Sequence, residues 1–212
     1  MPYLGRIVAA GLTPDGHACA MYRVSSRSFP NREAVVRDGC VSIVPRAGFE
    51  SDLGRNPYIA YHCIRPAGRF MVASNGSHTD PIAEKIAAGM PVRDAVALGL
   101  LAMDYEKDSL DTPRIVAVIG SGAPSACLGI VRKDAVLVRE FALRPGTLFY
   151  LSTYEHNRPC DSFTDANFDA GDAEAACRYM ISGGVFAAFT HPVTAACAVF
   201  DGREFQPAAL NA

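Results

Sequence analysis

The order of strand-like and helix-like segments is the feature that most restricts the fold of this chain. A block of apolar runs bounded by turn signals is followed by two helix-like segments, a second block of runs, one helix-like segment and two last runs. Strand runs that are segregated from helices are typical of α+β folds with mainly antiparallel sheets. We therefore expect an α+β fold in which two sheets stack face to face beneath helices, although periodicity alone does not establish the stacking.

The predicted elements follow from turn residues and apolar spacing. Strands are expected over 3–12, 17–24, 40–45, 58–64, 69–74, 114–120, 125–131, 134–143, 146–152, 185–190 and 194–200. Helices are expected over 80–89, 90–106 and 172–182. In the first helix, Asp80 is the expected N-cap, Pro81 takes the first helical position and Gly89 follows the end.

Composition limits the class of protein. With 212 residues, half of them hydrophobic, we expect a single domain over 1–212. A net charge of -2 argues against a general nucleic-acid-binding protein, so any anion site must be local. The seven cysteines include no C-x-x-C pair, which argues against a zinc ribbon or disulfide framework and suits the cytoplasm. We expect neither a signal peptide nor a membrane span, because Thr190, His191 and Pro192 interrupt the longest apolar run.

The stretch "YRVSSRSFPNR" over 22–32 gathers cationic and hydroxyl side chains in a chain that is not basic. Guanidinium groups match phosphate oxygens in a bidentate manner, and serine hydroxyls and turn amides add donors. A strand that enters such a loop is a candidate phosphate-binding site. The alternative is a solvated loop with ordinary surface arginines.

Three further polar stretches are candidates for chemistry, each with a plainer alternative. In "YIAYHC", strand alternation points Tyr61 inward, where it is either functional or a core tyrosine bonded to a carbonyl. Asn75 and His78 in "SNGSHTD" precede a helix N-terminus that favours anions, or simply form a turn and cap. Glu106 in "MDYEKD" is a general base if it is partly buried, and otherwise a solvated helix-end residue.

The sequence has no motif for a nucleophile or a metal. It contains neither G-x-S-x-G nor H-E-x-x-H, and no two histidines stand at metal-ligand spacing. We therefore expect no metal and no organic cofactor.

Six polar segments taken together resemble the archaeal-type IMP cyclohydrolase family over essentially the whole chain. They are "YRVSSRSFPNR", "NPYIAY", "SNGSHTD", "LLAMDYEKD", "TPRI" and "FAAFTHPVTAA". The resemblance implies a fold like that of the N-terminal-nucleophile hydrolases, a four-layer α-β-β-α sandwich. The chain departs from those hydrolases because it begins Met1-Pro2-Tyr3, without an N-terminal Cys, Ser or Thr. We therefore expect the fold without its usual nucleophile.

The resemblance also implies an activity. It is the dehydrative ring closure of 5-formamidoimidazole-4-carboxamide ribotide (FAICAR) to IMP and water, the last step of de novo IMP synthesis. The only implied partners are this small-molecule ribotide and further copies of the chain in a homo-oligomer. Arg32, Tyr61 and Glu106 match the family's catalytic positions. The expected substrate-binding residues are Arg23, Ser25, Ser26, Arg27, Asn75 and His78.

Two other functions stay open at this point. An amide hydrolase of the same fold would need processing that exposes a nucleophile such as Thr13 or Cys19. A nucleotide-binding sensor would bind IMP or a related ribotide without converting the formylated substrate.

Overall fold

The strands of the protein form two antiparallel sheets, as the segment order predicts. A computed structural model describes residues 2–212. Met1 lies outside the described residues, and so does the expectation that the chain begins without a Cys, Ser or Thr nucleophile. One sheet has the strand order β11 (Thr164–Asp165), β10 (Thr147–Ser152), β1 (Arg6–Leu12), β2 (Ala18–Ser25), β12 (Pro192–Phe200) and β13 (Phe205–Asn211). The other runs β3 (Arg32–Arg37), β4 (Cys40–Pro45), β5 (Tyr61–Ala67), β6 (Phe70–Ser74), β7 (Arg114–Gly120), β8 (Ser125–Arg132) and β9 (Ala135–Ala142).

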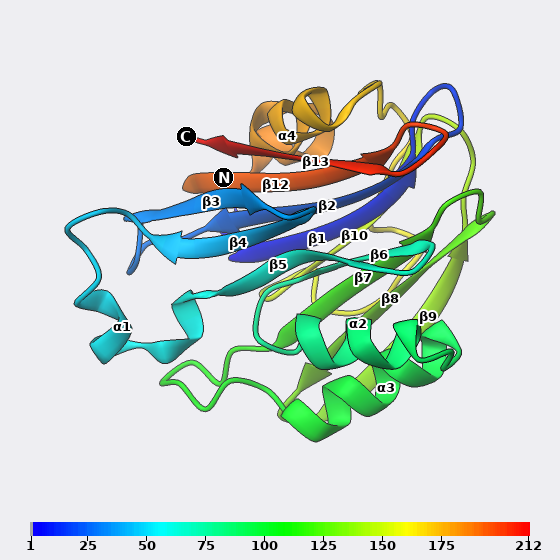
Figure 1. The fold of residues 1–212 in the computed structure, drawn as a ribbon. Helices are drawn as coiled ribbons and strands as arrows, with labels where there is room; N and C mark the ends of the chain where they lie inside the picture. The colour runs from blue at the N-terminus through cyan, green and yellow to red at the C-terminus, as the bar shows by residue number, and fades with distance from the viewer. Residues whose placement is uncertain (1) are drawn as a thin grey trace.

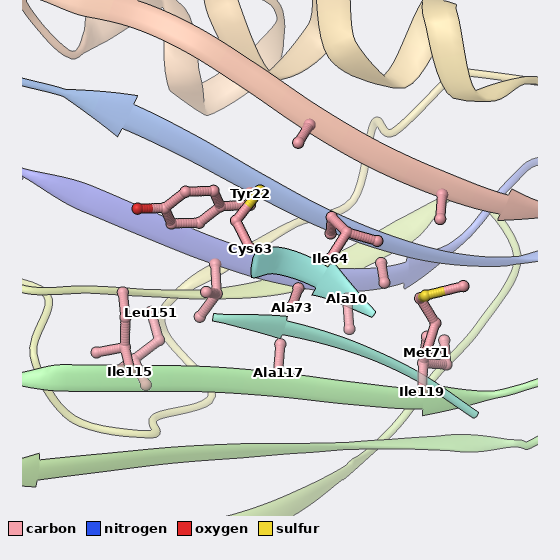
Figure 2. Packing of buried hydrophobic residues seen from close by; sticks show 14 of the residues in the cluster. Ala10, Tyr22, Cys63, Ile64, Met71, Ala73, Ile115, Ala117, Ile119 and Leu151 are labelled. Atoms are coloured by element: carbon pink, nitrogen blue, oxygen red, sulfur yellow. The ribbon is translucent and has the colours of Figure 1, made fainter. Parts of the chain in front are cut away.

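The two sheets stack face to face, with helices on both outer faces (Figure 1). The interior between the sheets contains Tyr22 from β2 together with Cys63 and Ile115 from the opposite sheet (Figure 2). Helix α4 (Ala173–Ser182) packs on the sheet that contains β1, whereas α2 (Thr79–Ala87) and α3 (Val92–Met103) pack on the other sheet. The layers are thus helix, sheet, sheet and helices.

Strand β2 illustrates why the central strands read as continuous apolar runs. All eight of its residues are buried. Tyr22 and Val24 face the interior between the sheets, whereas Cys19 and Met21 face α4. A strand that is covered on both faces has no polar alternate positions, so its sequence cannot show which face a given side chain takes.

The helices differ from the prediction mainly at their ends. Helix α2 begins at Thr79 with His78 at the N-cap position, so the expected N-cap role of Asp80 is wrong. Asp80 Oδ1 instead accepts one hydrogen bond from Arg65 Nη1 at 2.7 Å and lies 2.9 Å from His62 Nδ1. Helix α3 ends at Met103, and its C-cap residue Asp104 has a φ of 54°, which turns the chain toward residue 106. None of the helices within residues 2–212 combines the length and hydropathy that a membrane span needs.

The strand predicted over 185–190 is wrong, because Gly184–Ala188 forms the 3₁₀ helix η2. The main-chain N–H of Val185 donates to Asp165 Oδ2 at 2.9 Å, which secures this turn. Strands β3 and β13 and the short helices α1 (Asp52–Arg55) and η1 (Pro57–Ile59) were not predicted. In η1, Asn56 Oδ1 accepts from the N–H of Tyr58 at 2.8 Å, so an asparagine cap starts the turn.

Candidate active site

A pocket of about 430 Å³ is lined by residues at the start of β1 and by residues of α1 and η1. Four parts of the chain form most of its wall: Tyr3 and Arg6, the loop from β2 into β3, the segment 55–59, and the loop 106–110 after α3. Each lies at an end of a strand or short helix, so the sheets provide a rigid frame beneath side chains that are carried by loops.

Glu106 is the most deeply buried acid of this pocket, with an exposed fraction of 2%. Its Oε2 lies 3.5 Å from Arg6 Nη2, and its Oε1 lies 3.9 Å from Arg114 Nη1. Burial raises the pKa of Glu106 to about 7, although the two arginines oppose that change. A carboxyl group with this pKa is suited to accept a proton near neutral pH.

Arg6 and Arg32 line the pocket together with Glu106. Arg32 opens β3, is 3% exposed, and donates from Nε to the carbonyl of Phe29 at 3.1 Å. Within residues 2–212 its two Nη groups make no hydrogen bond, so they are available to a substrate. Burial alone would lower the pKa of Arg6, but the charge of Glu106 raises it overall, so Arg6 stays protonated.

Tyr61 lies next to this group but is not part of the pocket wall. Its side chain is in the interior between the sheets, where its hydroxyl lies 2.6 Å from the hydroxyl of Tyr22. Burial raises the pKa of Tyr61, while the charges of Arg32 and Arg6 act in the opposite direction. Tyr61 is therefore a protonated phenol within the electrostatic reach of the pocket's cations.

The predicted phosphate loop is only partly at the pocket. Ser26 lines it, and its Oγ accepts from the N–H of Phe29 at 3.0 Å. Arg27 is exposed, and its guanidinium carbon lies 4.1 Å from the ring centre of Tyr3, a pocket residue. These two residues remain candidates for the substrate's phosphate.

Arg23 and Ser25 do not line the pocket. Arg23 is fully buried beneath α4, and Ser25 Oγ accepts from its Nε at 3.0 Å. The other guanidinium donors bind five main-chain carbonyls at 2.7–3.5 Å, those of Met180, Ile181, Phe186, Phe189 and Thr190. Because its donors bind the connection from α4 to β12, the geometry favours a structural role for Arg23 with Ser25 as its partner. The phosphate contact expected of both residues stays a prediction.

Asn75 and His78 do not line the pocket, and their expected contact with substrate stays a prediction. Asn75 ties β6 to β7: its Nδ2 donates to the carbonyl of Pro113 at 3.0 Å, and its Oδ1 accepts from the N–H of Ile115 at 2.7 Å. His78 is buried, and its Nε2 lies 3.0 Å from the carbonyl oxygen of Ile115. His78 Nδ1 and Glu106 Oε1 both lie close to Gly76, which separates Asn75 from the residues before α2.

Sequence reasoning did not select Arg6, Tyr22 or Arg114. Arg6 opens the otherwise apolar strand β1 and is only partly exposed, and a charge next to such a buried run is a signal of a site. Arg114 opens β7 in "TPRI", and its guanidinium carbon lies 5.5 Å from the ring centre of Tyr58. Tyr22 gave no signal, because an inward tyrosine in an apolar strand is ordinary core.

Several known proteins are similar in sequence to this chain over nearly its full length. A family model described as IMP cyclohydrolase-like protein matches residues 3–204. The chain is 48% identical over 204 residues to a protein of Methanosphaera stadtmanae named IMP cyclohydrolase, covering 96% of each chain. The chain belongs to the IMP cyclohydrolase family. IMP cyclohydrolases of Methanocella arvoryzae (48% over 210 residues; 99% of this chain and 98% of that one) and Methanococcus aeolicus (42% over 202 residues; 94% and 96%) are also similar.

The pocket gathers groups that are suited to proton transfer and to the stabilisation of negative charge. It places a buried carboxyl group with a raised pKa beside two guanidinium groups, with a phenol close by. Such an arrangement can remove a proton from a weak nucleophile and stabilise charge on an oxygen. Among residues 2–212, no three His, Cys, Asp or Glu side chains are grouped so that they could hold a metal ion.

Proposed function

We propose that the pocket around Glu106 is the site at which this IMP cyclohydrolase converts FAICAR to IMP and water in purine biosynthesis. The carboxamide nitrogen attacks the formyl carbon, and one N–C bond forms. The carboxamide and the formamido nitrogen each lose one proton, and the formyl oxygen leaves with two protons as water. Both reacting groups are attached to one imidazole ring, so much of the entropic cost is already met and the enzyme supplies positioning and proton transfer.

The single observation that carries the proposal is the burial of Glu106 beside Arg6 in a pocket of substrate size. Glu106 takes the carboxamide proton, because its pKa of about 7 makes it a base near neutral pH. Arg32 stabilises the negative charge that develops on the formyl oxygen, since its Nη groups are available. Tyr61 donates a hydrogen bond to that oxygen and later helps it leave as water.

The charge of the pocket wall supports a ribotide monophosphate as substrate. Four cationic side chains (Arg6, Arg32, Arg55 and Lys107) line it against two acidic ones (Glu106 and Asp108). Ser26 and Arg27, at the loop that leads into β3, are the proposed phosphate contacts. A local cluster of this kind meets the needs of one phosphate without making the protein basic.

Several properties of the whole protein belong to the same proposal. The helix–sheet–sheet–helix layering supports a likeness to the N-terminal-nucleophile hydrolases, and an interior shared by both sheets supports one domain over 1–212. Seven free cysteines suit a reducing cytoplasm. Exposed Leu98 and Leu101 on α3 support a homo-oligomer, because large exposed apolar groups mark contact surfaces.

The test is a spectroscopic assay of FAICAR conversion by the purified chain, with IMP identified as the product. We expect conversion by the wild-type chain and a loss of about 10²-fold or more in Glu106→Gln, the scale of a lost general base. Glu174→Gln, on the exposed surface of α4, is the matched control. Binding of IMP without conversion of FAICAR would identify a nucleotide sensor and would refute the proposal.

A further inference from the structure

Behind Glu106 there is a second cluster of buried polar groups that the proposed reaction does not use. Four buried side-chain atoms have no hydrogen-bond partner within residues 2–212: His78 Nδ1, Glu106 Oε1, and Nε and Nη1 of Arg114. These three residues come from the start of α2, the loop after α3 and the start of β7. Buried polar groups are almost always hydrogen-bonded, so several such atoms in one place point to a ligand.

Gly76 shows that three of these atoms surround one point. A Cβ built on Gly76 would overlap Arg114 Nη1, and it would lie 3.2 Å from His78 Nδ1 and 3.5 Å from Glu106 Oε1. Because Gly76 has no side chain, Arg114 Nη1 can approach its backbone at a place where any other residue would collide with the guanidinium. The 3.9 Å between Arg114 Nη1 and Glu106 Oε1 is too long for a direct hydrogen bond and suits a bridging molecule.

The donors and acceptors of the cluster specify what the bridging molecule must be. His78 Nε2 lies 3.0 Å from the carbonyl oxygen of Ile115, so it carries the ring proton and Nδ1 is an acceptor. Glu106 Oε1 is a second acceptor when the carboxyl group is ionised, and Arg114 presents two donors. A ligand that lies between polar atoms only 3.9 Å apart, gives two hydrogen bonds and receives at least one from Arg114 Nη1 is water.

We propose that Gly76, His78, Glu106 and Arg114 form a binding site for one ordered water molecule, which holds Glu106 Oε1 so that Oε2 faces Arg6 and the substrate. Arg114 and His78 are then positioning residues for the base. The catalytic part of this inference rests on the proposed function, whereas the water site itself does not. Burial and the charge of Arg114 lower the pKa of His78 to about 3, so Nδ1 remains an acceptor throughout the working pH range.

The charged groups around Glu106 show what this site adds. Arg6 acts on it from β1, Arg32 from β3, Arg114 from β7 and Asp108 from its own loop. Arg6 and Arg114 lie on opposite oxygens of the carboxylate. Without the water, the carboxylate is free to turn toward one arginine, and a displacement of about 1 Å in a reacting group costs about 10²-fold in rate.

The first test is a high-resolution crystal structure of the wild-type chain, which needs no activity. We expect one water within hydrogen-bond distance of Glu106 Oε1, Arg114 Nη1 and His78 Nδ1. A site without this water, or a direct contact between Arg114 and Glu106 that closes it, overturns the inference. Failure of the wild-type chain to convert FAICAR would instead refute the proposed function, and the two failures are therefore distinguishable.

The second test is Gly76→Ala, whose methyl group would collide with Arg114 Nη1 and so displace a donor of the proposed water site. The matched control is Gly171→Ala, where a Cβ meets no heavy atom within 4 Å. We expect kcat of Gly76→Ala to fall about 10-fold to 100-fold with KM within about twofold, and the control to keep both values. If Gly76→Ala lacks the water but keeps the wild-type kcat per folded molecule, the positioning role of the water site is overturned.

Arg114→Lys and Arg114→Met separate charge from geometry. Lysine keeps the cation but not the fork of donors, whereas methionine removes both. We expect kcat to fall in both variants. Only Arg114→Met is expected to shift the acid limb of the pH profile of kcat/KM to higher pH, because it removes a positive charge that lowers the pKa of Glu106. Equal pH profiles and wild-type kcat in both variants would contradict a role for Arg114.

Discussion

The hydroxyl groups of Tyr22 and Tyr61 lie 2.6 Å apart in the interior between the two sheets. Tyr22 comes from β2 and Tyr61 from β5, so this bond joins one sheet to the other. Burial raises the pKa of both phenols, which keeps each of them a donor at neutral pH. If Tyr61 donates to the formyl oxygen of the substrate, Tyr22 donates to Tyr61 and fixes its orientation.

We predict that Tyr61→Phe lowers kcat by about 10²–10³-fold with little change in KM, the scale of one lost oxyanion donor. Tyr22→Phe removes the other half of the same bond but leaves the Tyr61 hydroxyl, so its loss of kcat is expected to be smaller. Both variants leave one phenol without its partner and are expected to lose about 1–3 kcal/mol of stability. Turnover and thermal unfolding are to be measured on the same preparations. If both variants lose the same stability but keep the wild-type turnover, Tyr61 is a core residue and has no part in the reaction.

We predict that kcat/KM rises with pH through about 7. Glu106 acts as a base only when ionised, and burial raises its pKa to about 7 against the opposing charges of Arg6 and Arg114. The acid limb of the pH profile of kcat/KM therefore reports deprotonation of Glu106 in the free enzyme, and activity falls as the pH is lowered through it. A pH series of initial rates with FAICAR checks this. A flat profile between about pH 5 and 8 would exclude Glu106 as the group that titrates.

The same pKa makes Glu106 costly for stability. A carboxyl group whose pKa is raised from 4.5 to about 7 binds its proton more tightly in the folded chain, so its ionisation removes stability as pH rises through that window. The loss is on the order of 3 kcal/mol. We predict that Glu106→Gln is more stable than wild type by about this amount at about pH 8, and that the difference vanishes near pH 4. Thermal unfolding at both pH values measures it, and a destabilised Glu106→Gln at pH 8 would contradict the prediction.

The sequence predicted the architecture better than the site. Apolar runs and turn residues suffice to find most strands, because each sheet buries whole runs of residues such as those of β2. The prediction of a strand over 185–190 was wrong because aromatic residues also suit a buried 3₁₀ turn. The turn is secured by a hydrogen bond to Asp165, which is distant in the sequence. Arg32 and Glu106 were placed in one pocket by family resemblance, not by spacing, since the residues are 74 positions apart (106 − 32).

Arg23 and Arg27 show what could not be predicted from the sequence. Arg23 and Arg27 stand in one polar stretch, but Arg23 is within β2 and points beneath α4, whereas Arg27 lies beyond the strand and is exposed. A strand buried on both faces gives no pattern from which that direction can be read.

These two arginines give a last, paired prediction. Arg27→Ala is expected to raise KM for FAICAR about tenfold with kcat unchanged, because a phosphate contact acts equally in the ground and transition states and one charge-assisted hydrogen bond is worth about 1.5 kcal/mol. Arg23→Met leaves five main-chain carbonyls without their donor, so we expect a loss of about 3–5 kcal/mol in stability and a wild-type KM in the folded fraction. Steady-state kinetics and thermal unfolding on both variants distinguish the roles. An Arg23→Met variant of normal stability with a raised KM would return Arg23 to the phosphate site, and an Arg27→Ala variant with reduced kcat and unchanged KM would move Arg27 to the reacting centre.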